Sequence, residues 1–221
     1  GQGRIDLHTR DADVPLSPLG EVQAGSLAAW FARLGDAERP QVILASPYVR
    51  ARQTAQAILA AGGAAHPDAP FCIDERLRER EFGVLDRLTA AGIRELFPDQ
   101  AEARSLVGKF YHRPPGGESW CDVILRLRSA LDTLSLHHRG QRVLVVAHQV
   151  VVLCFRYLLE GMDEARLLEV DATSAVANCG VTEYCLSSDR KRLELSRYNF
   201  VAPLMDAGAP VTSASDAPVA A

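Results

Sequence analysis

Two short, continuously apolar segments stand out in the pattern of hydrophobic and polar positions along the chain. They are VILAS (42–46) and VLVVAH (143–148), and both are rich in β-branched or aliphatic residues. Short uninterrupted apolar runs are typical of strands that are covered on both faces, as in parallel sheets. We therefore predict a buried strand at each segment.

Helical patterns follow both predicted strands, and two further helical patterns occur in the chain, one before each strand. One of them opens with Ser17, a preferred N-cap residue, and Pro18, which suits the first turn of a helix. Another is expected to bury a stripe formed by Val123, Leu127 and Leu131. The expected helices cover residues 17–35, 47–63, 117–136 and 149–159.

Near the end of the chain, VTEYCLS (181–187) and RLELSRYNF (192–200) read as an antiparallel pair of strands. Strands that alternate with helices indicate an α/β fold with a mostly parallel sheet and helices on both faces. We expect one domain over residues 1–204. The segment 205–221 is rich in Ala, Pro and Ser and offers little to bury, which predicts a disordered tail.

Composition narrows the possible partners. The formal net charge of −4 over 221 residues argues against a nucleic-acid-binding protein, but it is compatible with a small anionic substrate. No apolar stretch has the length of a membrane span and no secretory signal opens the chain, so we expect no membrane partner. Five scattered cysteines without a C-x-x-C pair favour free thiols and a cytoplasmic location. The sequence leaves the oligomeric state open.

Polar residues that could carry chemistry lie directly after the two predicted strands. Ligands of open α/β sheets bind outside the carboxyl ends of the strands, which makes His148 a candidate, although it could equally be a packed core histidine. The backbone N–H of Gln149 begins the following helix and could donate to an anion. Arg50, in the first turn after 42–46, could bind phosphate or carboxylate, or it could be a solvated helix arginine.

Two further segments allow a functional and a simpler interpretation. The charged run DERLREREFG (74–83) is most simply wet surface, but a carboxylate beside its Phe-Gly pair could be a general acid. The loop FYHRPPGGES (110–119) carries Tyr111, His112 and Arg113, which could line a substrate site or be ordinary loop residues.

Taken together, five segments resemble the histidine phosphatase superfamily, which is also called the phosphoglycerate mutase-like family. The order and spacing of the segments match the family over roughly residues 13–160. The resemblance implies a three-layer α/β/α fold and catalysis through a phosphohistidine intermediate. It implies no metal or other cofactor. The segments are PLSPLGEVQA, SPYVRARQTA, LREREFG, RPPGGESWCDV and VLVVAHQVVV.

The resemblance also implies roles for individual residues. Arg50 matches the phosphate-binding arginine of the S-P-x-x-R-A-x-Q-T motif, and Glu79 matches the acid of the E-x-x-F-G motif, in preference to Glu81. His148 matches the second histidine of the family, which binds phosphoryl oxygens beside the backbone N–H of Gln149. We expect these three side chains to be catalytic. Gln149, Tyr111 and Arg113 are the expected substrate-binding residues.

One family motif is missing from the sequence. No R-H-G tripeptide, which carries the nucleophilic histidine at the end of the first family strand, occurs in the 221 residues. His8 is a poor substitute, because no apolar strand precedes it and Thr9 stands where the glycine would be. We therefore expect that the first strand has been lost from the N-terminal side and that this chain alone hydrolyses no phosphate ester.

The expected function is hydrolysis of small phosphate monoesters. The R-P-P-G-G-E-S segment (113–119) resembles the phosphatase side of the superfamily, including fructose-2,6-bisphosphatase domains, more than it resembles the mutases. Two alternatives stay open. One is phosphoryl transfer of the phosphoglycerate mutase type, and the other is a catalytically inactive module that binds phosphate.

Overall fold

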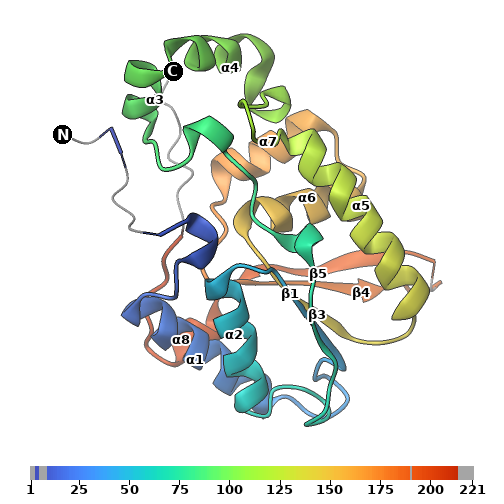
Figure 1. The fold of residues 1–221 in the computed structure, drawn as a ribbon. Helices are drawn as coiled ribbons and strands as arrows, with labels where there is room; N and C mark the ends of the chain where they lie inside the picture. Colours follow the sequence, from blue (N-terminus) through green and yellow to red (C-terminus); the bar gives the residue numbers. More distant parts are fainter. Residues whose placement is uncertain (1–2, 5–8, 190, 214–221) are drawn as a thin grey trace.

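The computed structural model describes residues 3–4, 9–189 and 191–213. It has a three-stranded sheet and a separate pair of strands, surrounded by helices (Figure 1). The strands are β1 (Val42–Ala45), β2 (Phe71–Ile73), β3 (Val143–Val146), β4 (Val181–Leu186) and β5 (Leu193–Phe200). The α-helices are α1 (Pro18–Arg33), α2 (Val49–Ala60), α3 (Ala90–Leu96), α4 (Pro98–Tyr111), α5 (Trp120–His137), α6 (Gln149–Glu160), α7 (Glu164–Thr173) and α8 (Ala202–Asp206).

The three-stranded sheet is parallel and has the order β2-β1-β3. Leu44 of β1 lies opposite Cys72 of β2 on one side and Val145 of β3 on the other. All four residues of β1 are buried, because β1 has a strand on each side. Every residue of β3 is only half-buried, and within the described part of the chain β3 pairs with β1 alone. The prediction of a fully buried strand at 143–148 therefore differs from the structure at this edge.

Successive residues of β1 and β3 face opposite layers of helices. Leu44 and Val145 belong to a core that contains Leu127 of α5 and Leu153 of α6. Ile43 and Leu144 belong to a second core, which is shared with α1 and α2. The period-two alternation of strand side chains thus fills both interfaces, and the predicted sheet with helices on both faces is confirmed.

The helices begin and end largely where their sequences indicate. Ser17 caps α1 by accepting a hydrogen bond from the backbone N–H of Gly20, with Pro18 in the first turn. Ser119 and Asp122 form a reciprocal capping box at the start of α5. Gly161 ends α6 in the left-handed conformation that favours glycine. The antiparallel pair of β4 and β5 is also as predicted.

The last segment differs from the predicted disordered tail. Residues 205–213 include the end of α8, and Ala209 is buried. The buried amide of Gln23 on α1 donates hydrogen bonds to the carbonyl of Pro210 and to Oγ1 of Thr212. A buried amide needs such partners, and the segment supplies them without large apolar side chains. Residues 214–221 lie outside the described residues, as does His8.

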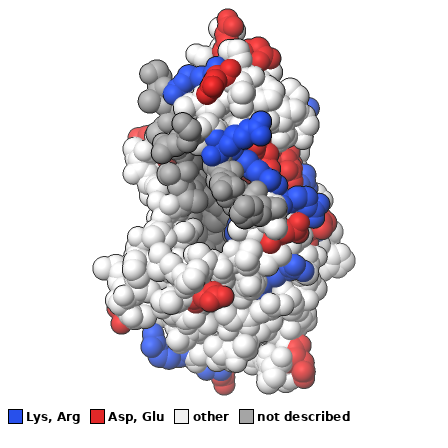
Figure 2. Space-filling view, turned by 60° about the vertical axis from the view of Figure 1, so that its left-hand side comes forward, with Lys and Arg blue, Asp and Glu red and all other residues white. Residues whose placement is uncertain are grey.

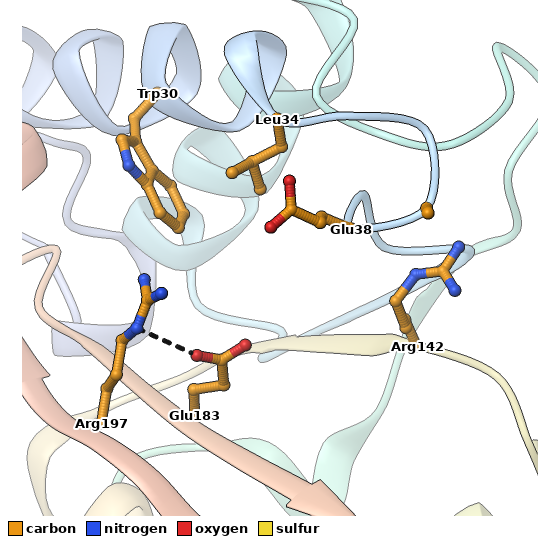
Figure 3. Close-up of a pocket in the computed structure, with 7 residues that line it drawn as sticks. Trp30, Leu34, Glu38, Arg142, Glu183 and Arg197 are labelled. Carbon is orange, nitrogen blue, oxygen red and sulfur yellow. Dashed lines mark ion pairs between the residues drawn. The ribbon is translucent and has the colours of Figure 1, made fainter.

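Figure 3 shows a pocket of about 220 Å³ lined by Trp30, Arg142, Glu183 and Arg197 among others. Arg197 of β5 forms an ion pair with its cross-strand partner Glu183 of β4 on one side of the pocket, with 3.3 Å between nitrogen and oxygen. Arg142 immediately precedes β3, so this pocket lies at the amino end of the sheet. The polar residues that follow β1 and β3 lie at the opposite end.

Candidate functional site

Two buried polar side chains meet at the carboxyl ends of β1 and β3. Ser46 follows the last residue of β1, and His148 lies two residues beyond β3. The Nε2 atom of His148 and the Oγ atom of Ser46 share a hydrogen bond of 2.7 Å. The contact joins residues 102 positions apart, and it arises because β1 and β3 pair in parallel, so that their ends coincide.

His148 has the environment of a neutral imidazole. Burial, and to a lesser extent the nearby charges of Arg50 and Arg126, lowers its pKa from the ordinary 6.5 to about 3. Its backbone is extended and forms the N-cap of α6, so Gln149 is the first residue of that helix. A neutral ring and a helix N-terminus side by side can both donate hydrogen bonds to an anion.

Glu79 approaches the other side of the same ring. Its Oε2 atom lies 3.8 Å from Nδ1 of His148, and its side chain is 18% exposed. Its Oε1 atom accepts a hydrogen bond from the backbone N–H of Arg80. A carboxyl group at this position is close enough to exchange a proton with a group bound beside the imidazole, directly or through one water molecule.

Arg50 lies in the first turn of α2, and its guanidinium stacks over the ring of Tyr48 at 4.8 Å from the ring centre. The same ring meets the His148 ring edge-on, with 4.8 Å between the ring centres. Arg50 and His148 thus flank one buried aromatic side chain. The guanidinium fork of Arg50 is held by Asp11, which accepts hydrogen bonds from both terminal nitrogens.

Tyr48 also contacts a second carboxylate. Its hydroxyl donates a 3.4 Å hydrogen bond to Oε1 of Glu81. Burial, followed by the charge of Glu81, raises the pKa of the Tyr48 hydroxyl well above its usual range. The hydroxyl therefore stays protonated and acts as a donor at neutral pH.

The loop that carries Glu79 is fixed by a nearly buried ion-pair network. Glu118 accepts hydrogen bonds from Arg78 and Arg126, and its other oxygen accepts from the backbone N–H of Glu81. Arg126 on α5 also donates to the backbone carbonyl of Arg76. The charged run 74–83 is therefore a positioned loop rather than only wet surface, since Arg78 pairs with Glu118 and Arg76 bonds to Ser129 and Thr133 of α5.

Two glycines let this loop lie directly against the loop at 114–117. The backbone N–H of Glu118 donates to the carbonyl of Glu81 at 2.8 Å. A Cβ atom on Gly83 would lie 2.2 Å from the carbonyl oxygen of Pro115, and one on Gly117 would lie 2.7 Å from the carbonyl oxygen of Glu81. Close backbone approach of this kind requires glycine.

The structure thus brings Arg50, Glu79 and His148 together and gives Tyr111 and Arg113 other partners. Tyr111 ends α4, is half-exposed and interacts with Glu164, which raises the pKa of its hydroxyl. Arg113 is exposed and forms an ion pair with Asp122 in the capping box of α5. The contacts that hold these two side chains therefore lie on α5 and α7, while Gln149 lies at the site.

Several contributors to the site lack an assigned role in the sequence-based prediction, among them Ser46, Asp11, Tyr48 and Arg126. Tyr48 lies between Ser46 and Arg50, and its position in a strand-to-helix junction is the one signal that could identify it. Arg126 shares a helix face with the buried Val123 and Ala130, so its burial follows from the period of α5. Nothing in the local sequence connects Asp11 with Arg50.

The distribution of charged side chains and of possible metal ligands among the described residues does not change this description of the site. On the face shown in Figure 2, Lys and Arg side chains are interspersed with Asp and Glu. The described residues contain no group of three or more His, Cys, Asp or Glu side chains suited to a metal ion. Among the helices of the described part of the chain, none combines the length and apolar character needed to cross a bilayer. All five cysteines are free thiols.

Comparison with solved structures supports the same architecture. The structure superimposes on Bacillus stearothermophilus YhfR with a TM-score of 0.70 at 24% identity, covering 87% of this chain and 88% of that one. It superimposes on a mycobacterial glucosyl-3-phosphoglycerate phosphatase, solved in complex with VO3, with a TM-score of 0.66 at 26% identity. That match covers 85% of this chain and 88% of the other.

Sequence comparison finds relatives of which this chain spans only a part. It is 35% identical over 143 residues to a 6-phosphofructo-2-kinase/fructose-2,6-bisphosphatase of Caenorhabditis elegans, covering 64% of this chain and 28% of the relative. It is 33% identical over 153 residues to the probable phosphoglycerate mutase GpmB of Enterobacter sp. (strain 638), covering 68% of this chain and 66% of the relative. The profile of branch 1 of the histidine phosphatase superfamily matches residues 2–199, and the chain belongs to that superfamily.

Proposed function

We propose that this chain provides the phosphate-binding site of a phosphatase that hydrolyses small phosphate monoesters. Arg50, His148 and the backbone N–H of Gln149 would bind the phosphoryl oxygens, and Glu79 would protonate the leaving oxygen. Three relatives carry the names of a bisphosphatase, a probable phosphoglycerate mutase and a phosphatase. These names describe enzymes that act on phosphate esters, which supports this substrate class.

The observation that carries the proposal is the convergence of three groups at the carboxyl ends of β1 and β3. A guanidinium, a neutral imidazole and a carboxyl group meet around Tyr48 and Ser46. Phosphoryl transfer spreads negative charge over the equatorial oxygens, so most of the catalysis comes from positioned cations and N–H donors. A carboxyl group on the opposite side of the imidazole suits protonation of the departing alcohol.

A phosphohistidine route needs an additional imidazole. In that route a histidine nitrogen attacks phosphorus, the ester oxygen leaves with a proton from Glu79, and water then attacks the phosphohistidine to release phosphate. Of the described histidines other than His148, His66 lies on the surface after α2, His112 follows α4, and His137 and His138 end α5. This distribution favours a second candidate function, in which the chain binds phosphate esters without turnover.

The first test measures binding of inorganic phosphate by calorimetry, using the 221-residue chain and two substitutions of Arg50. Loss of a bidentate, charge-assisted contact costs about 1.5–3 kcal/mol, so we expect Arg50→Ala to weaken phosphate binding about 10- to 100-fold. Arg50→Lys keeps the charge but not the fork and should give an intermediate affinity. Absence of phosphate binding in the unsubstituted chain would rule out both candidate functions.

Turnover tests whether this chain can act as a phosphatase without further residues. We expect phosphate binding without hydrolysis of p-nitrophenyl phosphate by this chain. Hydrolysis that disappears in His148→Ala would instead show that this chain contains a complete phosphatase site. Transfer of phosphate from a bisphosphorylated glycerate to a monophosphorylated one, without net release, would identify the mutase alternative.

A further inference from the structure

We infer that Asp11 determines the affinity of the site for phosphate by competing for Arg50. The inference rests on the proposed function, because it concerns the same arginine. In the structure, Nη1 of Arg50 donates to Oδ1 of Asp11 at 3.0 Å, and Nη2 donates to Oδ2 at 3.1 Å. Nη1 also donates to the backbone carbonyl of Asp11 at 2.8 Å. The Asp11 carboxylate thus accepts hydrogen bonds from both terminal nitrogens of the Arg50 guanidinium, as two oxygens of a phosphate would.

The segment that carries Asp11 is weakly attached elsewhere. Asp11 begins the single 3₁₀ turn Asp11–Asp13, in which no residue is buried. The next described anchor along the chain is the backbone N–H of Leu16, which donates to Oε1 of Gln53 on α2 at 2.7 Å. Between these points, the bonds to Arg50 are what hold Asp11 against α2. Its carboxylate can therefore leave the fork without unpacking a core.

The ion pair between Asp11 and Arg50 is strong enough to lower the affinity for phosphate and weak enough to be displaced by it. The side chain of Arg50 is 27% exposed and that of Asp11 is 37% exposed, so water competes for both. Partly exposed pairs of this kind are only moderately stable, because water solvates both partners. When only the open fraction of a protein binds a ligand, the apparent dissociation constant rises by the inverse of that fraction.

Electrostatics adds to this competition. Asp11 is one of the charges that raise the pKa of Tyr48, and Arg50 acts on the same hydroxyl in the opposite direction. Asp11 is therefore close to the ring that separates Arg50 from His148. A phosphate bound there would experience repulsion from the Asp11 carboxylate unless the side chain turned away. Removing the carboxylate should thus strengthen phosphate binding for two reasons.

The test measures the affinity for inorganic phosphate in Asp11→Asn, Asp11→Ala and a matched control. We expect Asp11→Asn to bind phosphate about 5- to 10-fold more tightly than the unsubstituted chain. Asp11→Ala should gain at least as much, because the amide oxygen of asparagine can still accept one hydrogen bond from Arg50. Asp13→Asn is the control: Asp13 belongs to the same turn but pairs with Arg10, so its phosphate affinity should be unchanged.

The possible outcomes separate this inference from the proposed function. Equal or weaker phosphate binding in both Asp11 variants, with Arg50→Ala still impaired, would overturn the inference and leave the proposed function intact. An equal gain in Asp13→Asn would also overturn it, because the effect would then be one of net charge alone. Failure of every variant to bind phosphate would overturn the proposed function and the inference with it.

A second measurement reports on the ion pair in the absence of phosphate. In NMR spectra, the Arg50 guanidinium N–H resonances should show hindered rotation in the unsubstituted chain and lose it in Asp11→Ala. Addition of phosphate to Asp11→Ala should restore it. Unchanged guanidinium resonances in Asp11→Ala would show that Asp11 does not restrain the fork, and would overturn the inference.

Discussion

His148 is neutral because it is buried, and its burial makes the free energy of unfolding depend on pH. Its pKa is about 3 in the folded chain, and its ordinary value is 6.5. Between these two values the unfolded chain binds a proton that the folded chain does not. The free energy of unfolding therefore rises with pH across this window and falls as the solution becomes acidic.

The expected loss can be measured by urea denaturation. Relative to pH 7.5, His148 should lower the free energy of unfolding at pH 5 by about 2 kcal/mol. His148→Gln keeps a side chain that can bond to Ser46 but cannot titrate, so the difference between pH 7.5 and pH 5 should shrink by about that amount. His66→Gln, at an exposed position, serves as the control. An identical pH dependence in His148→Gln and the unsubstituted chain would contradict the assignment.

Individual site residues differ in how far the sequence predicts them. Arg50 and His148 were identifiable because each lies where an apolar strand leads into a helix, and parallel strands end at one edge. Asp11 was not, because its contact with Arg50 spans 39 positions and depends on how an irregular segment lies across α2.

At the level of elements, the loop of residues 79–83 and the loop of residues 114–117 form one docked unit. Their contact is backbone to backbone, and Gly83 additionally has a φ of +56°. The position of Glu79 beside His148 thus depends on a neighbouring loop as well as on its own.

Substitution of Gly83 tests this dependence. Gly83→Ala combines a left-handed backbone with a clash against the carbonyl of Pro115, so we expect a loss of about 2–4 kcal/mol in the free energy of unfolding. Gly140→Ala is the matched control. Gly140 has a φ of +77° but no atom within 4 Å of the added Cβ, so only the conformational cost of about 1 kcal/mol should remain. Equal losses in the two variants would show that the close approach of the loops contributes nothing.

The elements themselves were predictable where their pattern was long and regular. Helices α1, α2, α5 and α6 have an apolar face and clear end signals, and the sequence places them within a few residues. Strand β2 consists of the apolar residues Phe71, Cys72 and Ile73, and a run of three residues is too short to predict a strand. Helix α4 contains Gly108 with a φ of 83°, which interrupts its helical geometry and its periodicity.

For the whole molecule, the alternation of strands and helices was sufficient to predict the α/β architecture. Two cores on opposite faces of one sheet follow from the period-two alternation in β1 and β3. The extent of the ordered chain was not predictable from composition. Residues 205–213 pack through Gln23 and backbone hydrogen bonds, which leave no hydrophobic signature in the sequence.

The half-buried strand β3 affects the tendency of this chain to self-associate in concentrated solution. One side of Val143–Val146 bonds to β1, and within the described residues no strand bonds to the other side. An apolar strand whose outer backbone donors and acceptors bond to no described strand can serve as a template for a strand of another molecule. In sedimentation velocity, we expect the apparent mass to rise from low to high micromolar concentration; a constant monomer mass would contradict this. The same valines that build the core would then make the chain prone to aggregation.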